Sequence, residues 1–182
     1  MRKLTQSAFN VLVLAMLLGA TIQAAAAGTI TFNGELAQNT CDVSIGGQGA
    51  SGTVVLPTVQ TSLLQSPGQT AGKQRFSIYF SGCSSLQGQV AAFFEAGPTV
   101  DPITGRLKNT DSTGATNVSL QLLNTMQNNN PIQAGNQNQI ANNDYVIIYN
   151  TVTLAYDVQY YAEGNTTPGL VNSSVVYSLM YK

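Results

Sequence analysis

The chain has 182 residues, of which only 8% are charged, and its formal net charge is −1. Such sparse and balanced charge argues against a nucleic-acid-binding surface and against electrostatic binding to a membrane. The sequence contains no histidine, which removes the usual general base, the usual metal ligand and every catalytic triad that depends on imidazole. We therefore expect no enzyme, no metal site and no cofactor.

The N-terminal segment has the order of a secretory signal peptide. Arg2 and Lys3 precede an apolar run from Val11 to Leu18, and small residues follow. We predict a signal peptide over residues 1–24, with cleavage possible at several alanines between 20 and 27. The mature chain of roughly 155–160 residues suits one domain with a real core. No later stretch approaches the roughly 18 apolar residues of a membrane helix, so the mature chain is not expected to span a membrane.

Residues 25–34 are predicted to form an N-terminal arm that acts as a strand. Gly28, Ile30 and Phe32 fall on every second position, which is the period of a strand with one buried face. In an ordinary domain Asn33-Gly34 would be the turn of a hairpin, but the alanines before Gly28 form an arm more easily than a protected core strand. We therefore predict that this strand completes another molecule.

Cys41 and Cys83 are the two cysteines of the chain. In an exported protein they are expected to form one disulfide, because two thiols without a histidine leave a zinc site short of ligands. The bond would close a loop of about 43 residues, for which chain entropy gives roughly 4 kcal/mol of stabilisation.

The amino-acid composition and the spacing of turn residues predict an all-β fold. With 43% apolar residues and 17 glycines, the chain favours strands and turns over helices. The segment from Asn124 to Asp144 is rich in Asn and Gln and is predicted as a long loop with one short edge strand. Short strands separated by turn signals predict a two-sheet, immunoglobulin-like sandwich. The predicted strands cover residues 35–45, 53–56, 73–82, 89–96, 116–123, 145–161 (with a bend) and 171–182.

We interpret the charged and tyrosine side chains as structural and not as parts of a catalytic or sugar-binding site. Lys73 and Arg75 share one face of a predicted strand and are expected to face solvent. Tyrosines that alternate with Val and Leu in the terminal strands favour core or groove lining over a sugar-stacking platform. The acids sit singly and mostly beside turns, which favours solvated loop charges over a catalytic carboxylate pair; they are Glu35, Asp42, Glu95, Asp101, Asp111, Asp144, Asp157 and Glu163.

Several motifs together resemble the type 1 fimbrial (pilus) major subunit family of the chaperone–usher pathway. Each motif is weak alone, but their order and spacing span most of the mature chain. They are Gly28-Thr29-Ile30-Thr31-Phe32-Asn33-Gly34 followed by Cys41, Cys83 at the end of a strand, Gly114-Ala115-Thr116-Asn117-Val118, Tyr160-Tyr161-Ala162, Thr167-Pro168-Gly169, and the penultimate Tyr181. The resemblance implies that residues 35–182 form a pilin domain, an incomplete immunoglobulin-like β-sandwich completed by a donor strand from a neighbouring subunit.

The resemblance also implies partners and a role for particular residues. A periplasmic chaperone would lend a strand, an outer-membrane usher would receive the subunit, and the arm of the next pilin subunit would then replace the chaperone strand. Gly28, Ile30 and Phe32 would be the donor residues. The acceptor groove and chaperone edge would include Val175, Tyr177, Leu179, Tyr181 and the carboxylate of Lys182.

The expected product is a head-to-tail polymer of identical or related subunits. The chain would be exported through the periplasm to the cell surface as the structural subunit of a fimbria that supports cell adhesion. The alternatives are a minor tip or adaptor pilin, or a secreted carbohydrate-binding β-sandwich module.

Overall fold

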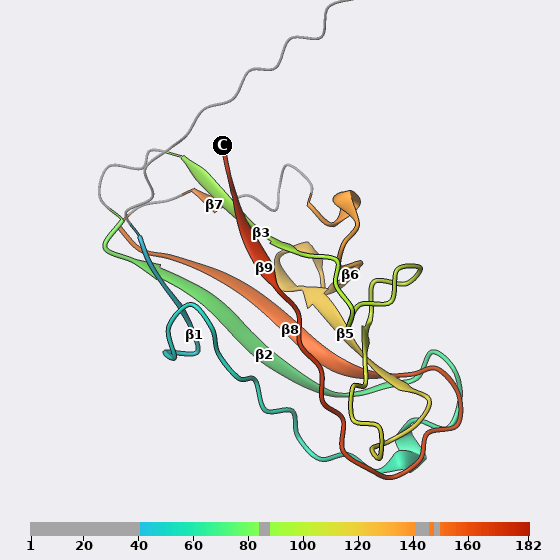
Figure 1. Ribbon diagram of the computed structural model, residues 1–182. Helices are drawn as coiled ribbons and strands as arrows, with labels where there is room; N and C mark the ends of the chain where they lie inside the picture. The colour runs from blue at the N-terminus through green and yellow to red at the C-terminus, as the bar shows by residue number, and fades with distance from the viewer. Residues whose placement is uncertain (1–40, 84–87, 141–145, 148–149) are drawn as a thin grey trace, which may run out of the picture. The chain divides into compact units, whose positions relative to one another are not determined.

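The computed structural model describes residues 41–83, 88–140, 146–147 and 150–182 (Figure 1). The predicted signal peptide, the arm and the donor residues Gly28, Ile30 and Phe32 lie outside this part of the chain. Regular structure within it is almost entirely β, which confirms the predicted class. The strands are β1 (Asp42–Ile45), β2 (Thr70–Ser81), β3 (Gln89–Phe94), β4 (Leu107–Lys108), β5 (Val118–Asn124), β6 (Asn130–Ile132), β7 (Val146–Ile147), β8 (Val152–Ala162) and β9 (Tyr177–Tyr181).

Three single-turn 3-10 helices accompany the strands in the described part of the chain: η1 (Thr61–Leu63), η2 (Thr125–Gln127) and η3 (Gln137–Gln139). Asn124 caps η2 and Asn136 caps η3, each by accepting a hydrogen bond from a main-chain N–H two residues ahead. Among the described residues, no helix has the length and apolar character needed to cross a bilayer. The Asn-rich stretch is thus a connection with its own turn chemistry, and β6 is its one short predicted strand.

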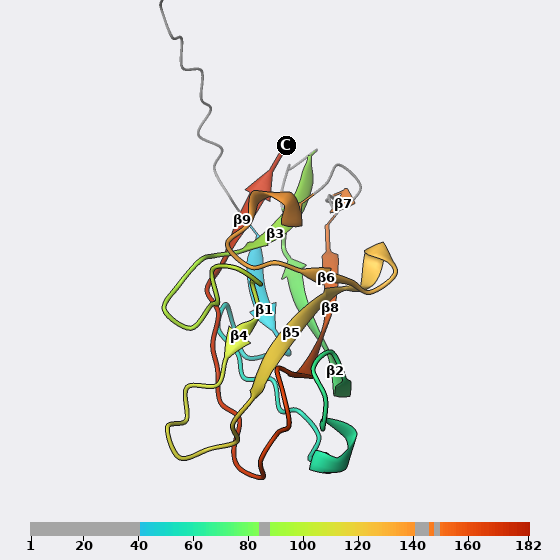
Figure 2. The same ribbon diagram turned by 90° about the vertical axis from the view of Figure 1, so that its right-hand side faces the viewer.

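The strands form two antiparallel sheets (Figures 1 and 2). The larger sheet has the order β1-β2-β8-β5-β4, with β6 also paired to β5, and the smaller has the order β7-β3-β9. Strand β8 is central: Tyr156 lies opposite Phe76 of β2, and Val158 lies opposite Leu122 of β5. The predicted two-sheet arrangement is confirmed.

The core lies where the inward faces of the two sheets meet. Its largest fully buried side chains are Ile78, Phe80, Leu154 and Val90, which come from β2, β8 and β3. The predicted alternation along β2 is confirmed, because Ile78 and Phe80 are buried while Tyr79 between them is 41% exposed. In β2, a period of two thus places one face in the core and the other outside it, whereas every residue of β5 is buried.

The disulfide between Cys41 and Cys83 is present, with the two Cα atoms 4.2 Å apart. Cys41 directly precedes β1, and Cys83 follows the end of β2. Because Asp42 pairs with Ser81 in the β1–β2 ladder, the bond ties the start of the edge strand to the end of its only ladder partner in the described residues.

Three predicted strands differ from the observed ones. Residues 53–56 and 171–176 are extended but belong to no ladder within the described residues, and the last strand begins only at Tyr177. The predicted strand 145–161 divides between β7 in the small sheet and β8 in the large one. The alternating pattern reports burial on one face, which an extended segment can achieve without a hydrogen-bonded neighbour.

One prediction about charged residues is wrong and another is confirmed. Asp157 is not a loop charge: it lies in β8 and is 3% exposed. Arg75 faces solvent as predicted, with its side chain 63% exposed, and it also donates from Nε to Asp157 Oδ1 at 2.9 Å. The physical reason is the register of β2 against β8, which places these two residues directly opposite each other.

Candidate strand-binding edge

The hydrogen-bonding register of β9 shows which of its main-chain groups face β3. Gln89 and Lys182 exchange two bonds, from Gln89 N to Lys182 O at 2.8 Å and from Lys182 N to Gln89 O at 3.0 Å, and Glu95 N donates to Val176 O at 2.8 Å. Antiparallel strands alternate bonded and non-bonded pairs. The even-numbered residues of β9 therefore bond to β3, whereas Tyr177 and Leu179 direct their N–H and C=O groups to the opposite edge.

Phe94 provides an independent check of this register. It lies opposite Tyr177 in the β3–β9 ladder. Its N–H donates to Gln139 Oε1 at 2.8 Å and its carbonyl accepts from Gly135 N at 2.8 Å, so both groups point away from β9. Phe94 and Tyr177 therefore form a non-bonded pair, as the alternation requires.

The same alternation continues before β9, where there is no ladder. The N–H of Asn172 donates to Asn109 Oδ1 at 2.9 Å. Its carbonyl accepts from Thr110 N at 2.8 Å, and the carbonyl of Ser174 accepts from Thr99 Oγ1 at 2.6 Å. The odd-numbered residues make no main-chain hydrogen bond within the described part of the chain. We call the main-chain groups of Val171, Ser173, Val175, Tyr177 and Leu179 the open edge.

The side chains of the open edge face the core. Val171, Val175, Tyr177 and Leu179 are half-buried and pack against the core, whereas Val176 between them is 71% exposed. Half-burial distinguishes this row from the fully buried residues of β2 and β8. Apolar side chains that are packed on one side and accessible on the other mark a surface able to accept more apolar contact.

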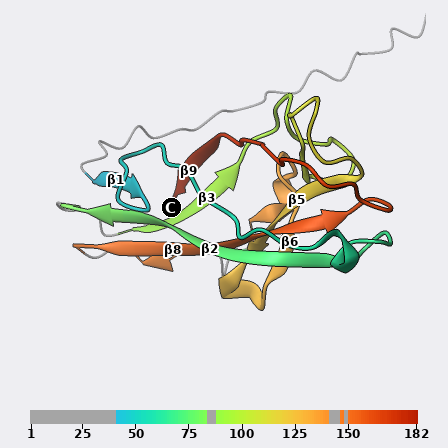
Figure 3. The same ribbon diagram turned by 90° about the horizontal axis from the view of Figure 1, so that it is seen from below.

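A second half-buried row comes from the extended segment before η1. Val54 and Leu56 pack against the same core, while Val55 between them is 78% exposed. In the view of Figure 3 this segment passes between β9 and β2. The hydroxyl of Tyr177 donates to the carbonyl of Ala50 at 2.8 Å, which links β9 to the loop that leads into this segment. Burial raises the pKa of the Tyr177 phenol.

The structure places the predicted acceptor residues in two groups. Val175, Tyr177 and Leu179 lie together in the half-buried row, and their role in accepting a strand stays a prediction. Tyr181 and Lys182 are exposed at the end of β9, and Lys182 bonds to Gln89 through its main chain. The predicted site did not include Val54 and Leu56, although the sequence predicts a short strand over residues 53–56.

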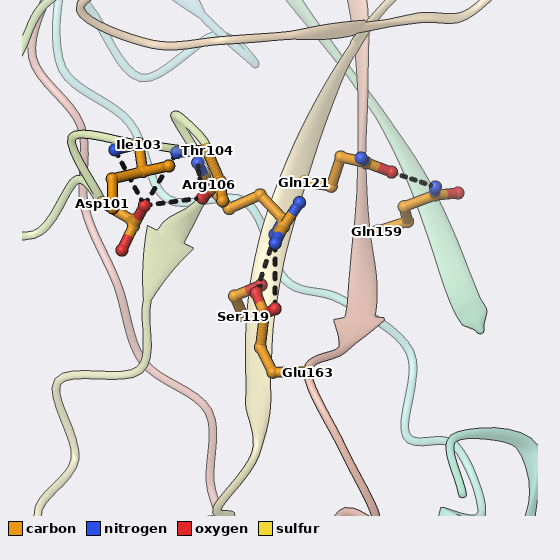
Figure 4. Close-up of polar contacts among 8 residues, drawn as sticks. All are labelled: Asp101, Ile103, Thr104, Arg106, Ser119, Gln121, Gln159 and Glu163. Carbon is orange, nitrogen blue, oxygen red and sulfur yellow. Dashed lines mark hydrogen bonds and ion pairs between the residues drawn. The ribbon is translucent and has the colours of Figure 1, made fainter. Parts of the chain in front are cut away.

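A separate polar cluster lies on the outer face of the large sheet (Figure 4). Arg106 donates to both carboxylate oxygens of Glu163, at 2.7 and 2.9 Å, and its guanidinium lies 4.0 Å from the ring centroid of Tyr161. Ser119 Oγ also donates to Glu163, at 2.6 Å. These bonds from Arg106 and Ser119 fix the position of the Glu163 carboxylate. We therefore interpret the cluster as structural.

The family model and the relatives that match this chain are fimbrial proteins. The model of the family described as "Type-1 fimbrial protein, A" matches residues 56–182. The "Major fimbrial subunit SMF-1" of Stenotrophomonas maltophilia is 43% identical over 171 residues, which cover 91% of this chain and 99% of that protein. The "F17 fimbrial protein" of Escherichia coli is 40% identical over 160 residues, which cover 85% of this chain and 87% of that protein.

Solved structures share the fold at lower sequence identity. The P pilus rod subunit PapA has a TM-score of 0.59 and 16% identity, with 79% of this chain and 99% of that chain covered. A subunit from the structure of a chaperone–usher pilus has a TM-score of 0.59 and 19% identity, with 86% and 96% covered. These neighbours are pilin subunits with an immunoglobulin-like fold, which confirms the predicted sandwich type.

Proposed function

We propose that this chain, which belongs to the type-1 fimbrial protein family, polymerises by donor-strand exchange. As a member of that family, the chain is a structural subunit of surface fimbriae and not an enzyme. In this proposal the arm of one subunit, residues 25–34, inserts beside the open edge of the next. Each subunit donates at one end and accepts at the other, so the polymer grows head to tail without closing.

The observation that carries the proposal is the open edge itself. From Val171 to Leu179, alternate residues present main-chain N–H and C=O groups that have no partner in the described part of the chain. An exposed edge of this kind recruits a further strand, and strand addition to a sheet edge is an established mode of peptide recognition. An arriving strand would satisfy these groups by extending the β7-β3-β9 sheet.

The side chains of the arm match the half-buried rows in character and period. Gly28, Ile30 and Phe32 would point toward Val175, Tyr177 and Leu179 and toward the row of Val54 and Leu56. Burying Ile30 and Phe32 would contribute about 1.5–3 kcal/mol each. Gly28 has no side chain, which suits a place where two backbones approach closely.

The proposal also includes the steps before assembly. A periplasmic chaperone would cover the same open edge by lending a strand, and the terminal carboxylate of Lys182 would be available to basic residues of its cleft. An outer-membrane usher would then exchange the chaperone for the next subunit. The assembled fimbria would lie outside the cell and support adhesion. The similarity to a major fimbrial subunit over nearly the whole chain favours the main repeating subunit over a minor adaptor.

The proposal is tested by thermal unfolding of a chain that begins at Glu35, with and without a synthetic peptide spanning Thr21 to Asn33. We expect a large upward shift in Tm with the peptide, because a ligand that binds only the folded state stabilises it. A peptide carrying Phe32→Asp should give little or no shift. A chain from Glu35 that is monomeric, unfolds cooperatively and shows no shift with either peptide would contradict donor-strand exchange.

A further inference from the structure

Part of the open edge lies outside the sheet. Strand β9 begins at Tyr177, so Val171, Ser173 and Val175 belong to the open edge without being held by a ladder in the described residues. An edge that receives a strand must be extended before the strand arrives, because ordering it during binding would reduce the affinity. The structure must therefore hold residues 171–175 extended by other contacts.

Asn109, which follows β4, makes four side-chain hydrogen bonds, two of them to the C-terminal segment. Its Nδ2 donates to the carbonyls of Ala115 and Leu170, each at 2.9 Å. Its Oδ1 accepts from Asp111 N at 3.1 Å and from Asn172 N at 2.9 Å. The side chain amide has two N–H donors and two acceptor lone pairs, so Asn109 uses its full capacity. Two of the four bonds reach across to the C-terminal segment.

The loop around Asn109 adds further bonds to the same two residues. Ala115 N donates to Leu170 O at 2.9 Å, and Thr110 donates to Asn172 O from both N, at 2.8 Å, and Oγ1, at 3.0 Å. A Cβ atom at Gly114 would overlap the carbonyl oxygen of Leu170, so only glycine permits this close approach. We call these contacts of the loop 109–115 with Leu170 and Asn172 the clasp.

The clasp bonds only to even-numbered residues of the C-terminal segment. It thereby leaves the N–H and C=O groups of Val171 and Ser173 directed to the open edge. Strand β3 does the same for β9, where it bonds the even-numbered residues and leaves Tyr177 and Leu179 open. The clasp therefore continues the function of β3 beyond the end of the ladder.

We propose that Asn109 is a positioning residue for strand exchange, which keeps residues 170–172 extended so that the first half of the open edge is ready for the arriving strand. This inference rests on the function proposed above. Asn109 does not touch the open edge itself, and Val171 packs against the core independently of it. Loss of Asn109 should thus loosen the edge near Val171 and leave the β3–β9 half in place.

The test uses polymers of the full-length protein purified from cells that export it. We expect Asn109→Ala polymers to dissociate in denaturant about ten-fold faster than wild type, the factor produced by losing one or two net hydrogen bonds. Hydrogen exchange should accelerate at the amides of Val171 and Ser173 but not at those of Tyr177 and Leu179. Asn136→Ala is the matched control, because Asn136 also makes side-chain bonds in a loop, away from the open edge.

A pair of variants at Thr110 tests the same contacts if Asn109→Ala fails to fold. Thr110 is exposed, and Thr110→Val removes its hydroxyl bond to Asn172 with little change of shape, whereas Thr110→Ser keeps the hydroxyl. We expect dissociation about two- to three-fold faster for Thr110→Val, as for the loss of one weak net bond, and wild-type behaviour for Thr110→Ser.

Two results would overturn the positioning role. One is wild-type dissociation and exchange in both Asn109→Ala and Thr110→Val. The other is equal loosening of all five open-edge amides, which would indicate a general loss of stability. If wild-type polymers leave those amides unprotected, strand exchange at this edge is wrong, and the role of Asn109 is wrong with it.

Discussion

The carboxylate of Glu163 is held at the end of β8 by donors from two other elements. Burial raises its pKa, but the hydrogen bonds from Arg106 and Ser119 outweigh burial, and the pKa lies below its ordinary value. A pKa that is lower in the folded state than in the unfolded state stabilises the protein above the unfolded pKa of about 4.3. That stabilisation is lost as the pH falls through the lower folded pKa.

Glu163→Gln should therefore reduce the acid sensitivity of the fold. We expect the fall in Tm between neutral pH and about pH 2, across the carboxylate range, to be smaller in the variant than in wild type. Because the side chain of Glu163 is 40% exposed, solvent screening limits its contribution to about 1 kcal/mol or less. In an Arg106→Gln background the same change should have a smaller effect, and equal effects in both backgrounds would contradict this origin of the pKa.

Arg75 and Asp157 combine an exposed cation with a buried anion. The Arg75 side chain is 63% exposed and the Asp157 side chain is 4% exposed. Arg75→Ala should lower Tm, because it leaves a buried carboxylate without its cation, and Asp157→Asn added to that variant should restore part of the loss. Lys73→Ala, an exposed residue of the same strand, is the control. A Tm equal to wild type in Arg75→Ala would show that the pair adds no stability.

At the scale of elements, β1 depends on a covalent link. It has four residues, and among the described strands it pairs only with β2. Replacing Cys41 and Cys83 together by Ser should cost roughly 4 kcal/mol in the free energy of unfolding, as the chain-entropy model gives for a loop of this length. Urea unfolding measures the cost, and hydrogen exchange should show β1 opening before β8. An unchanged urea midpoint would remove the stabilising role of the disulfide.

Local patterning predicted these strands: period-two alternation predicted β2, β5 and β8, and an apolar run of strand length predicted β3. It could not separate residues 53–56 and 171–176 from true strands, because a ladder depends on a neighbour far away in the chain. For the same reason, the sequence could not predict the pair of Arg75 with Asp157, 82 positions apart. It also could not predict the hydrogen bond between Asn109 and Asn172, 63 positions apart. Contacts of this kind are set by sheet order and register, which local patterns do not contain.

At the scale of the whole molecule, the proposed assembly would depend on a match between two distant parts of the chain. The arm carries the apolar side chains, and the C-terminal segment carries the open main-chain groups. If the proposal holds, a subunit could fold and accept a strand while being unable to donate one. Substitutions in the arm therefore test donation by itself, because they leave the residues of the open edge unchanged.

Phe32→Asp in the full chain should stop fibre growth while leaving the subunit able to bind a chaperone. The change removes about 1.5–3 kcal/mol of apolar burial and would bury a carboxylate without a partner. Thr31→Asp is the matched control, because Thr31 lies on the opposite face of the predicted strand and should keep its charge in solvent. Electron microscopy of surface fibres and the yield of chaperone-bound subunit are the two measurements. Normal fibres from Phe32→Asp would exclude the arm as the donor, whereas loss of fibres in both variants would show that the arm does not bind as a one-faced strand.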